Sequence, residues 1–91
     1  MRLRNTKAYL RCLRGRRDAE LQAVAASMAQ AAETFGNPHA HSGTGIRRLS
    51  NNLFECRVSL ELRLLFTRDE GALVFVFAGN HDDVQAFLRN R

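Results

Sequence analysis

The chain has 91 residues, enough for one domain with a modest core and too few for a two-domain enzyme. Hydrophobic residues make up 45% and charged residues 25%, as in an ordinary soluble globular protein, and no apolar run is long enough to cross a membrane. The formal net charge of +5 indicates a polyanionic partner, either nucleic acid or an acidic protein segment. We therefore expect a single domain, residues 1–91, that binds a polyanion.

The N-terminal segment concentrates this charge, because seven basic residues precede the first acidic one, Asp18. They are Arg2, Arg4, Lys7, Arg11, Arg14, Arg16 and Arg17. Each one alone can be read as part of a solvated helix surface, but the whole cluster favours a surface that faces a polyanion. The segment also lacks the apolar core of a signal peptide, which predicts a cytoplasmic protein.

The first two elements are a short edge strand and a helix. Met1–Asn5 alternates in the manner of a strand, and Thr6 is a good N-cap for a helix that reaches about Arg14. Gly15 then breaks this helix. Its predicted packing side is formed by Tyr9, Leu10 and Leu13.

A second helix is predicted from an N-cap at Asp18 to about Phe35. Its apolar residues recur at helical spacing and form one packing stripe. The stripe consists of Leu21, Val24, Ala25, Met28, Ala32 and Phe35. Gly36-Asn37-Pro38 ends the helix, and residues 39–45 form a loop.

The second half of the chain has the pattern of a strand meander. A first strand is expected at Ile46–Leu49, followed by alternating apolar and polar residues in Leu53–Val58 and Leu62–Thr67. Asp69-Glu70-Gly71 is a hairpin turn. Leu73–Ala78 is apolar on both faces, as expected of a central strand that is covered on both sides.

A short last helix completes the chain, with Asp82 as its N-cap and Asp83–Leu88 as its body. Helices followed by strands predict an α+β fold. Two N-terminal helices cover one face of a three- or four-stranded antiparallel sheet, and the other face stays open. The two cysteines, Cys12 and Cys56, are expected to be free buried thiols because neither has a second ligand or partner at a suitable spacing.

The open face carries the candidate site. Arg57 and Arg63 lie an even number of residues apart across a short connection, so both side chains project from the face opposite the apolar one. Two like charges close together cost stability unless an anion or a carboxylate such as Glu61 lies between them. The alternative is structural, with Arg63 as the ion-pair partner of Glu61 or Glu55.

Three short segments of the chain match motifs of a known family and are spaced along the sequence as they are in that family. The segments are Glu55-Cys56-Arg57, Leu62-Arg63-Leu64-Leu65-Phe66 and Gly79-Asn80-His81. With them, the whole chain resembles the RelE/ParE superfamily of bacterial toxins. The resemblance implies a RelE-like microbial ribonuclease-type fold and a ribosome-dependent endoribonuclease that cuts mRNA. It also implies a cognate antitoxin as partner, in a heterotetramer or larger toxin–antitoxin complex.

RNA cleavage through the 2′-hydroxyl needs a base, an acid and cationic groups on the phosphate. We expect Arg57 and Arg63 to bind the phosphate, because a guanidinium makes two parallel hydrogen bonds to it. His81 is the best acid or base, since histidine titrates near neutral pH. Glu61 is expected to act as a base or to orient an arginine. No metal or cofactor is expected, because the arginines supply the positive charge.

Further RNA contacts are expected from the other basic residues and from the loop histidines. They are Arg14, Arg16, Arg17, His39, His41, Arg47 and Arg48. Only one of Arg47 and Arg48 can face the site, because they are adjacent on a strand. His39 and His41 either join the site or remain solvated in their loop.

The chain differs from the family pattern at two positions, and both differences leave it with a weaker aromatic platform on which a nucleobase could stack. The only tyrosine, Tyr9, lies in the first helix, and Leu62 replaces an aromatic residue before the second arginine. Two alternatives to the nuclease therefore stay open. One is a ParE-like gyrase-targeting toxin, which needs no acid or base, and the other is a non-catalytic basic module that binds RNA or an acidic protein segment.

Overall fold

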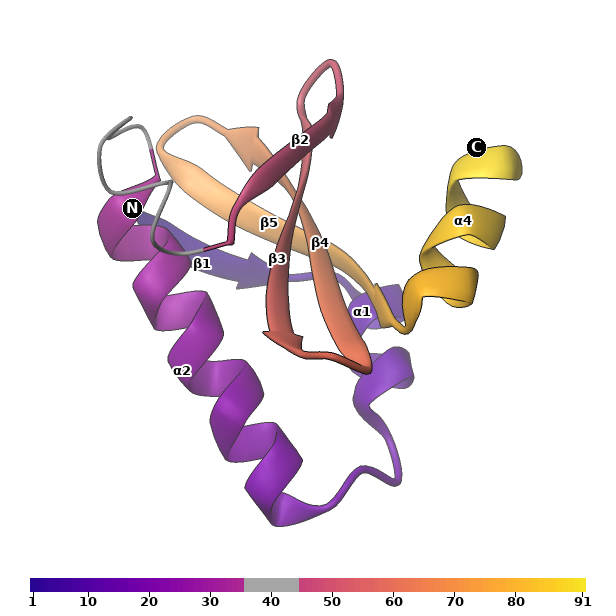
Figure 1. The fold of residues 1–91 in the computed structure, drawn as a ribbon. Coiled ribbons are helices and arrows are strands. Elements are labelled where there is room, and N and C mark those ends of the chain that lie inside the picture. Colours follow the sequence, from indigo (N-terminus) through magenta and orange to yellow (C-terminus); the bar gives the residue numbers. More distant parts are fainter. Residues whose placement is uncertain (36–44) are drawn as a thin grey trace.

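The computed structural model describes residues 1–35 and 45–91. Within these ranges the chain folds into a mixed sheet flanked by helices on both faces (Figure 1). The strands are β1 (Arg2–Asn5), β2 (Arg47–Ser50), β3 (Leu53–Ser59), β4 (Leu62–Asp69) and β5 (Ala72–Gly79). The predicted loop histidines, His39 and His41, lie outside the described residues.

The strand order is β1-β5-β4-β3-β2, in which β2 to β5 form an antiparallel meander. The predicted α+β fold is confirmed, with one difference in the sheet. The N-terminal strand adds a fifth member and pairs parallel to β5, so the sheet is mixed and larger than the three or four antiparallel strands expected. This pairing places β5 in the interior of the sheet, which explains why its sequence is apolar on both faces.

The β4–β5 connection is the predicted hairpin turn. Glu70 and Gly71 both have positive φ, 46° and 79°. A two-residue turn of this kind matches the right-handed twist of the strands that it joins, and glycine adopts such a φ without strain.

Helix α1 (Lys7–Leu13) begins as predicted at Thr6, whose Oγ1 accepts a hydrogen bond from the backbone N–H of Tyr9 at 3.1 Å. Helix α2 (Asp18–Thr34) begins one residue earlier than predicted, because Arg17 rather than Asp18 has the extended backbone of an N-cap. Asp18 instead lies in the first turn, where a negative charge suits the partial positive charge of the helix end.

Both helices pack on the same face of the sheet around one core cluster, which includes Tyr9, Val24, Met28, Leu64, Phe66 and Phe75. The buried line of α2 differs from the predicted stripe: Ala31 is buried, whereas Leu21 and Ala25 are exposed. Leu10 of α1 was also predicted to pack but is 48% exposed. Helical spacing shows that one side of a helix is apolar, but two neighbouring stripes of residues can satisfy the same spacing. The packing of the helix against the sheet decides which of the two is buried.

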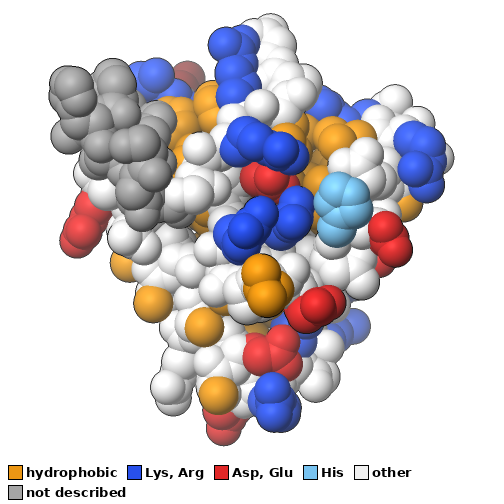
Figure 2. Space-filling model, viewed as in Figure 1, with side chains coloured by type: hydrophobic (Ala, Val, Ile, Leu, Met, Phe, Trp, Pro, Cys, Tyr) orange, Lys and Arg blue, Asp and Glu red, His pale blue; other side chains and the backbone are white. Residues whose placement is uncertain are grey.

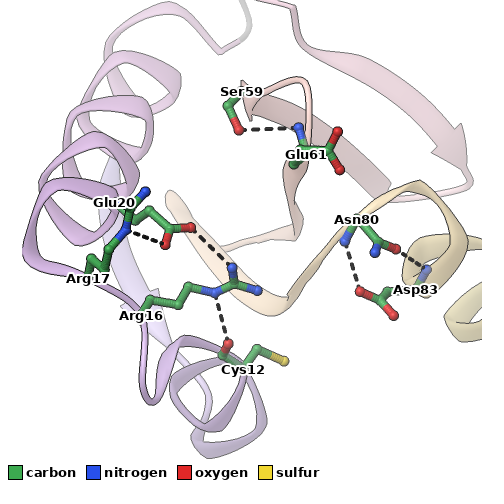
Figure 3. Close-up of polar contacts among 8 residues, drawn as sticks. All are labelled: Cys12, Arg16, Arg17, Glu20, Ser59, Glu61, Asn80 and Asp83. Carbon is green, nitrogen blue, oxygen red and sulfur yellow. Dashed lines mark hydrogen bonds and ion pairs between the residues drawn. The ribbon is translucent and has the colours of Figure 1, made fainter.

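Helix α4 (His81–Arg89) covers part of the other face, so the prediction that this face is open was wrong. Its Val84, Phe87 and Leu88 pack with Leu53, Leu65 and Phe77. The helix also begins before the predicted cap at Asp82. Asn80 is the N-cap, and its side chain accepts from Asp83 N–H while the Asp83 carboxylate accepts from Asn80 N–H (Figure 3).

None of the helices in residues 1–35 and 45–91 is both long and apolar enough to cross a membrane.

Candidate active site

Arg57 of β3 and Arg63 of β4 are direct partners across the strand pair. Both side chains therefore lie on one face of the sheet, which is the face that α1 and α2 do not cover. Arg57 is exposed, whereas the side chain of Arg63 is only 15% exposed to solvent. The prediction that the two arginines share this face is confirmed.

The carboxylate among these arginines belongs to Glu55. Its side chain is 7% exposed, and its Oε2 lies 3.0 Å from Arg47 Nη2 and 3.8 Å from Arg63 Nη1. Glu55 comes from β3, Arg47 is its cross-strand partner on β2, and Arg63 lies on β4. A buried charge is tolerated only when it is paired, and here two guanidiniums pair with it.

Sequence reasoning considered Glu55 only as an ion-pair partner and favoured Glu61. The signal for Glu55 was its position two residues before Arg57, on the same face of the same strand. Glu61 instead follows a register shift between Arg57 and Ser59 and lies in the β3–β4 turn, where its N–H donates to Ser59 Oγ at 3.3 Å (Figure 3). Within the described residues, the Glu61 carboxylate makes no ion pair.

His81 is the first residue of α4, and its Nδ1 lies 3.4 Å from Arg63 Nη1. A guanidinium has only donors, so a hydrogen bond between the two groups would use Nδ1 of His81 as the acceptor. Gly79 makes the sharp entry to the helix possible, because a Cβ there would come within 2.6 Å of Asp83 Cβ. The Gly-Asn-His sequence thus places the histidine beside Arg63.

The two adjacent arginines of β2 diverge, as predicted for neighbours on a strand. Arg47 faces Glu55. Arg48 turns to the β2–β3 connection, where it donates to Ser50 O at 3.2 Å and to Asn51 Oδ1 at 3.3 Å.

Arg14, Arg16 and Arg17 lie at the connection between α1 and α2. Arg16 Nε donates to Cys12 O at 3.2 Å, and Arg16 Nη1 pairs with Glu20 Oε2 at 3.3 Å (Figure 3). Arg17 Nε lies 3.7 Å from the other Glu20 oxygen. Glu20 therefore pairs with both arginines, but only Arg16 is largely enclosed, since the Arg17 side chain remains 85% exposed.

Figure 2 shows the surface that results from this arrangement. Basic side chains surround an acidic one near the centre of the view, and a histidine borders them. The arrangement is a cationic surface with a titratable ring at its edge, which suits the binding of a phosphate ester.

The cysteines take no part in this surface. Both are free; Cys56 is buried and Cys12 is half-buried. Burial, and secondarily the charge of Glu55, raises the pKa of the Cys56 thiol to about 12. A thiol held in its protonated form is a poor nucleophile, so Cys56 is a core residue.

No protein-family model matches the sequence, and no curated protein is significantly similar to it. Solved structures are similar in fold. The RelB–RelE antitoxin–toxin complex from Methanococcus jannaschii contains a chain that superposes with a TM-score of 0.69 at 8% identity, over 92% of this chain and 96% of that one. A copper-bound mutant toxin from Helicobacter pylori gives 0.61 at 16% identity, over 92% and 98% of the two chains. YafQ from E. coli gives 0.61 at 12% identity with the same coverage.

The fold and the site thus define a small α+β protein with a cationic sheet face. More narrowly, its fold is shared with a chain of the RelB–RelE antitoxin–toxin complex and with the Helicobacter pylori toxin.

Proposed function

We propose that this protein is the toxin of a toxin–antitoxin module and acts as a metal-independent endoribonuclease that cuts mRNA on the ribosome. The observation that carries the proposal is the position of Arg63. It lies opposite Arg57 and 3.4 Å from His81, and Glu55 holds it by charge. The similarity in fold to toxins of known structure supports the same class.

The reaction is an internal transfer at phosphorus. The 2′-oxygen of a ribose attacks the adjacent phosphate, so the O2′–P bond forms while the P–O5′ bond breaks. A base takes the 2′ proton and an acid gives a proton to the leaving 5′ oxygen. The products are a 2′,3′-cyclic phosphate and a 5′-hydroxyl, and no other reactant is needed.

Arg57 and Arg63 bind the non-bridging phosphate oxygens and stabilise the charge that accumulates on them in the transition state. Their charges replace the one that a metal would bring. His81 is the candidate donor to the 5′ oxygen. It acts in its imidazolium form, which gives up one of its two ring protons and becomes the neutral imidazole. Glu61, an exposed carboxylate in the turn between the two arginine-bearing strands, is the candidate base.

Glu55 has a positioning role in this scheme. Since its carboxylate is buried between Arg47 and Arg63, it fixes the guanidinium of Arg63 before the substrate binds. A donor that is already in place needs no reorganisation during the reaction.

We further propose that a cognate antitoxin neutralises this cytoplasmic toxin by covering the cationic face. An antitoxin segment would bring acidic side chains to the arginines and apolar ones beside them, so that charge speeds the encounter and burial prolongs it. Binding that does not depend on salt, with the arginines left exposed, would contradict this role.

The gyrase-targeting and non-catalytic alternatives need no titratable group beside the arginines. The contact between His81 and Arg63 therefore favours the nuclease over both of them.

Induced expression, with growth and mRNA cleavage measured together, tests the proposal. The parent should stop growth and cut mRNA, and the Arg57→Ala/Arg63→Ala variant should do neither. Arg68→Ala/Arg89→Ala is a matched control, because it removes the same charge from exposed positions. Toxicity of the parent without mRNA cleavage, accompanied by loss of gyrase activity, would support the gyrase alternative instead.

The ends of the RNA fragments provide a second readout. Cleavage by the purified protein on programmed ribosomes should leave a 2′,3′-cyclic phosphate and a 5′-hydroxyl. Fragments with a 5′-phosphate would contradict attack by the 2′-oxygen.

A further inference from the structure

Helix α1 presents a line of cations directly away from the core. Lys7, Arg11 and Arg14 are separated by four and three residues, so they follow one side of the helical path. The opposite side holds Tyr9, which is fully buried, and the half-buried Leu13. Lys7, Arg11 and Arg14 are all exposed. We call these three residues the α1 basic surface.

No carboxylate neutralises this surface within the described part of the chain. Other cations are paired: Arg4 with Asp69, Arg16 and Arg17 with Glu20, and Arg47 with Glu55. No such pair involves the α1 basic surface, and residues 1–17 contain no Asp or Glu. Like charges at this spacing destabilise a short helix by a few tenths of a kcal/mol, roughly, and a bound polyanion removes that repulsion.

The α1 basic surface faces away from the candidate active site. The buried side of α1 packs in the same cluster as Cys56, Leu64 and Phe66, which point to the helix-covered face of the sheet. Arg57 and Arg63 point to the other face. The two cationic surfaces therefore belong to opposite faces of the sheet.

We propose that the α1 basic surface binds the phosphate backbone of folded RNA, separately from the cleavage site. The inference rests on the proposed function in that RNA is the partner. The surface carries three cations and a single large exposed apolar side chain, Leu10. Three charges in line suit a chain of phosphates, whereas a tight protein contact needs a cluster of buried apolar anchors at its centre. Arg16 and Arg17 contribute less than Arg14 because Glu20 occupies them.

Binding of the full chain to a fully paired RNA hairpin, measured by fluorescence anisotropy over a range of salt, tests this surface without cleavage. Lys7→Ala/Arg11→Ala/Arg14→Ala should weaken binding about 100-fold at physiological salt and reduce the slope of log affinity against log salt by roughly 2 to 3. Arg68→Ala/Arg89→Ala/Arg91→Ala removes equal charge elsewhere and should change both far less. Arg11→Lys/Arg14→Lys should bind nearly as well as the parent, since phosphate contacts tolerate a point charge.

Equal weakening by the two triple variants would overturn the inference, because net charge alone would then explain binding. No weakening by either would also overturn it. A third adverse result is that the Lys7→Ala/Arg11→Ala/Arg14→Ala variant loses binding to polyglutamate but still binds RNA. That result would assign the surface to an acidic protein. Hairpin binding that depends on α1 in a protein without ribonuclease activity would uphold the inference and refute the proposed function. If the parent cuts mRNA but the Lys7→Ala/Arg11→Ala/Arg14→Ala variant binds the hairpin as well as the parent does, the proposed function would stand and this inference would be refuted.

Discussion

Two glutamates in this molecule are each shared by two arginines. Glu20 of α2 pairs with Arg16 and Arg17, which precede it by four and three residues. Glu55 of β3 pairs with Arg47 and Arg63, which come from the strands on either side. The side chain of Glu20 is 34% exposed and that of Glu55 only 7%.

The difference lies in what surrounds each cluster. The Glu20 cluster is local and closes the connection between two helices. The Glu55 cluster is assembled by the sheet, and it has Arg57 opposite Arg63 and His81 in contact with Arg63. The same residue types therefore act as a structural clamp in one place and form a candidate phosphate site in the other. Burial and neighbouring strands make the distinction, not composition.

Removing one arginine from each cluster tests the comparison most strongly. Arg63→Ala should reduce mRNA cleavage roughly 100- to 1000-fold, the effect of losing one donor to the transition state. Arg63→Lys should restore part of it, because a point charge cannot replace the bidentate fork. Arg16→Ala should leave the cleavage step unchanged in assays with saturating ribosomes. Equal cleavage by Arg63→Ala and the parent, with both folded by circular dichroism, would refute the assignment.

The histidine gives the next effect. His81→Asn should slow cleavage by about 100-fold, because asparagine can hydrogen-bond but cannot deliver a proton. Asp82→Asn, at the next exposed position of the same helix turn, is the control and should cut normally. Single-turnover rates on programmed ribosomes measure both. If the His81→Asn variant cleaves within a few-fold of the parent rate, His81 is not the general acid of the reaction.

Stability separates the two glutamates. Glu55→Gln should lower the free energy of unfolding by about 2 to 3 kcal/mol, since it leaves the half-buried Arg63 without its counter-charge. Glu20→Gln should cost less than about 1 kcal/mol, as expected for an exposed ion pair. Urea unfolding of both variants provides the comparison. Similar losses for the two would mean that burial does not distinguish the clusters.

Arg57 should behave differently from Arg63. It faces a like charge and forms no ion pair with any described residue, so Arg57→Ala should leave stability unchanged or raise it by roughly 0.5 kcal/mol. Cleavage should nevertheless fall. A clear loss of stability in urea unfolding would assign Arg57 a structural role instead.

The smallest expected effect is on the pKa of the Cys56 thiol, which the negative charge of Glu55 helps to raise. Glu55→Gln should lower the pKa of Cys56 slightly from about 12, and burial should keep it well above the ordinary value of 9. Because the folded pKa is raised, the thiol's contribution to stability is present below pH 9 and is lost as pH rises toward 12. Thiolate absorbance in a Cys12→Ser background measures this titration, and Glu20→Gln should leave it unchanged.

Much of the fold could be predicted because its signals are local. Thr6 caps a helix, Glu70-Gly71 makes a two-residue turn, and the alternation in β3 and β4 assigns Arg57 and Arg63 to one face. Each of these depends on residues a few positions apart, whose geometry the backbone itself restricts.

The tertiary structure alone decided which segments meet. Arg2 of β1 pairs with Ala72 of β5 across most of the chain, and α4 packs on the face that was expected to be open. The same holds for the site, since three neighbouring strands bring Arg47, Glu55 and Arg63 together while Arg16 and Arg17 are taken up by Glu20. Periodicity shows which face a side chain occupies, but its partner depends on strand order and register, which arise only when the whole sheet assembles.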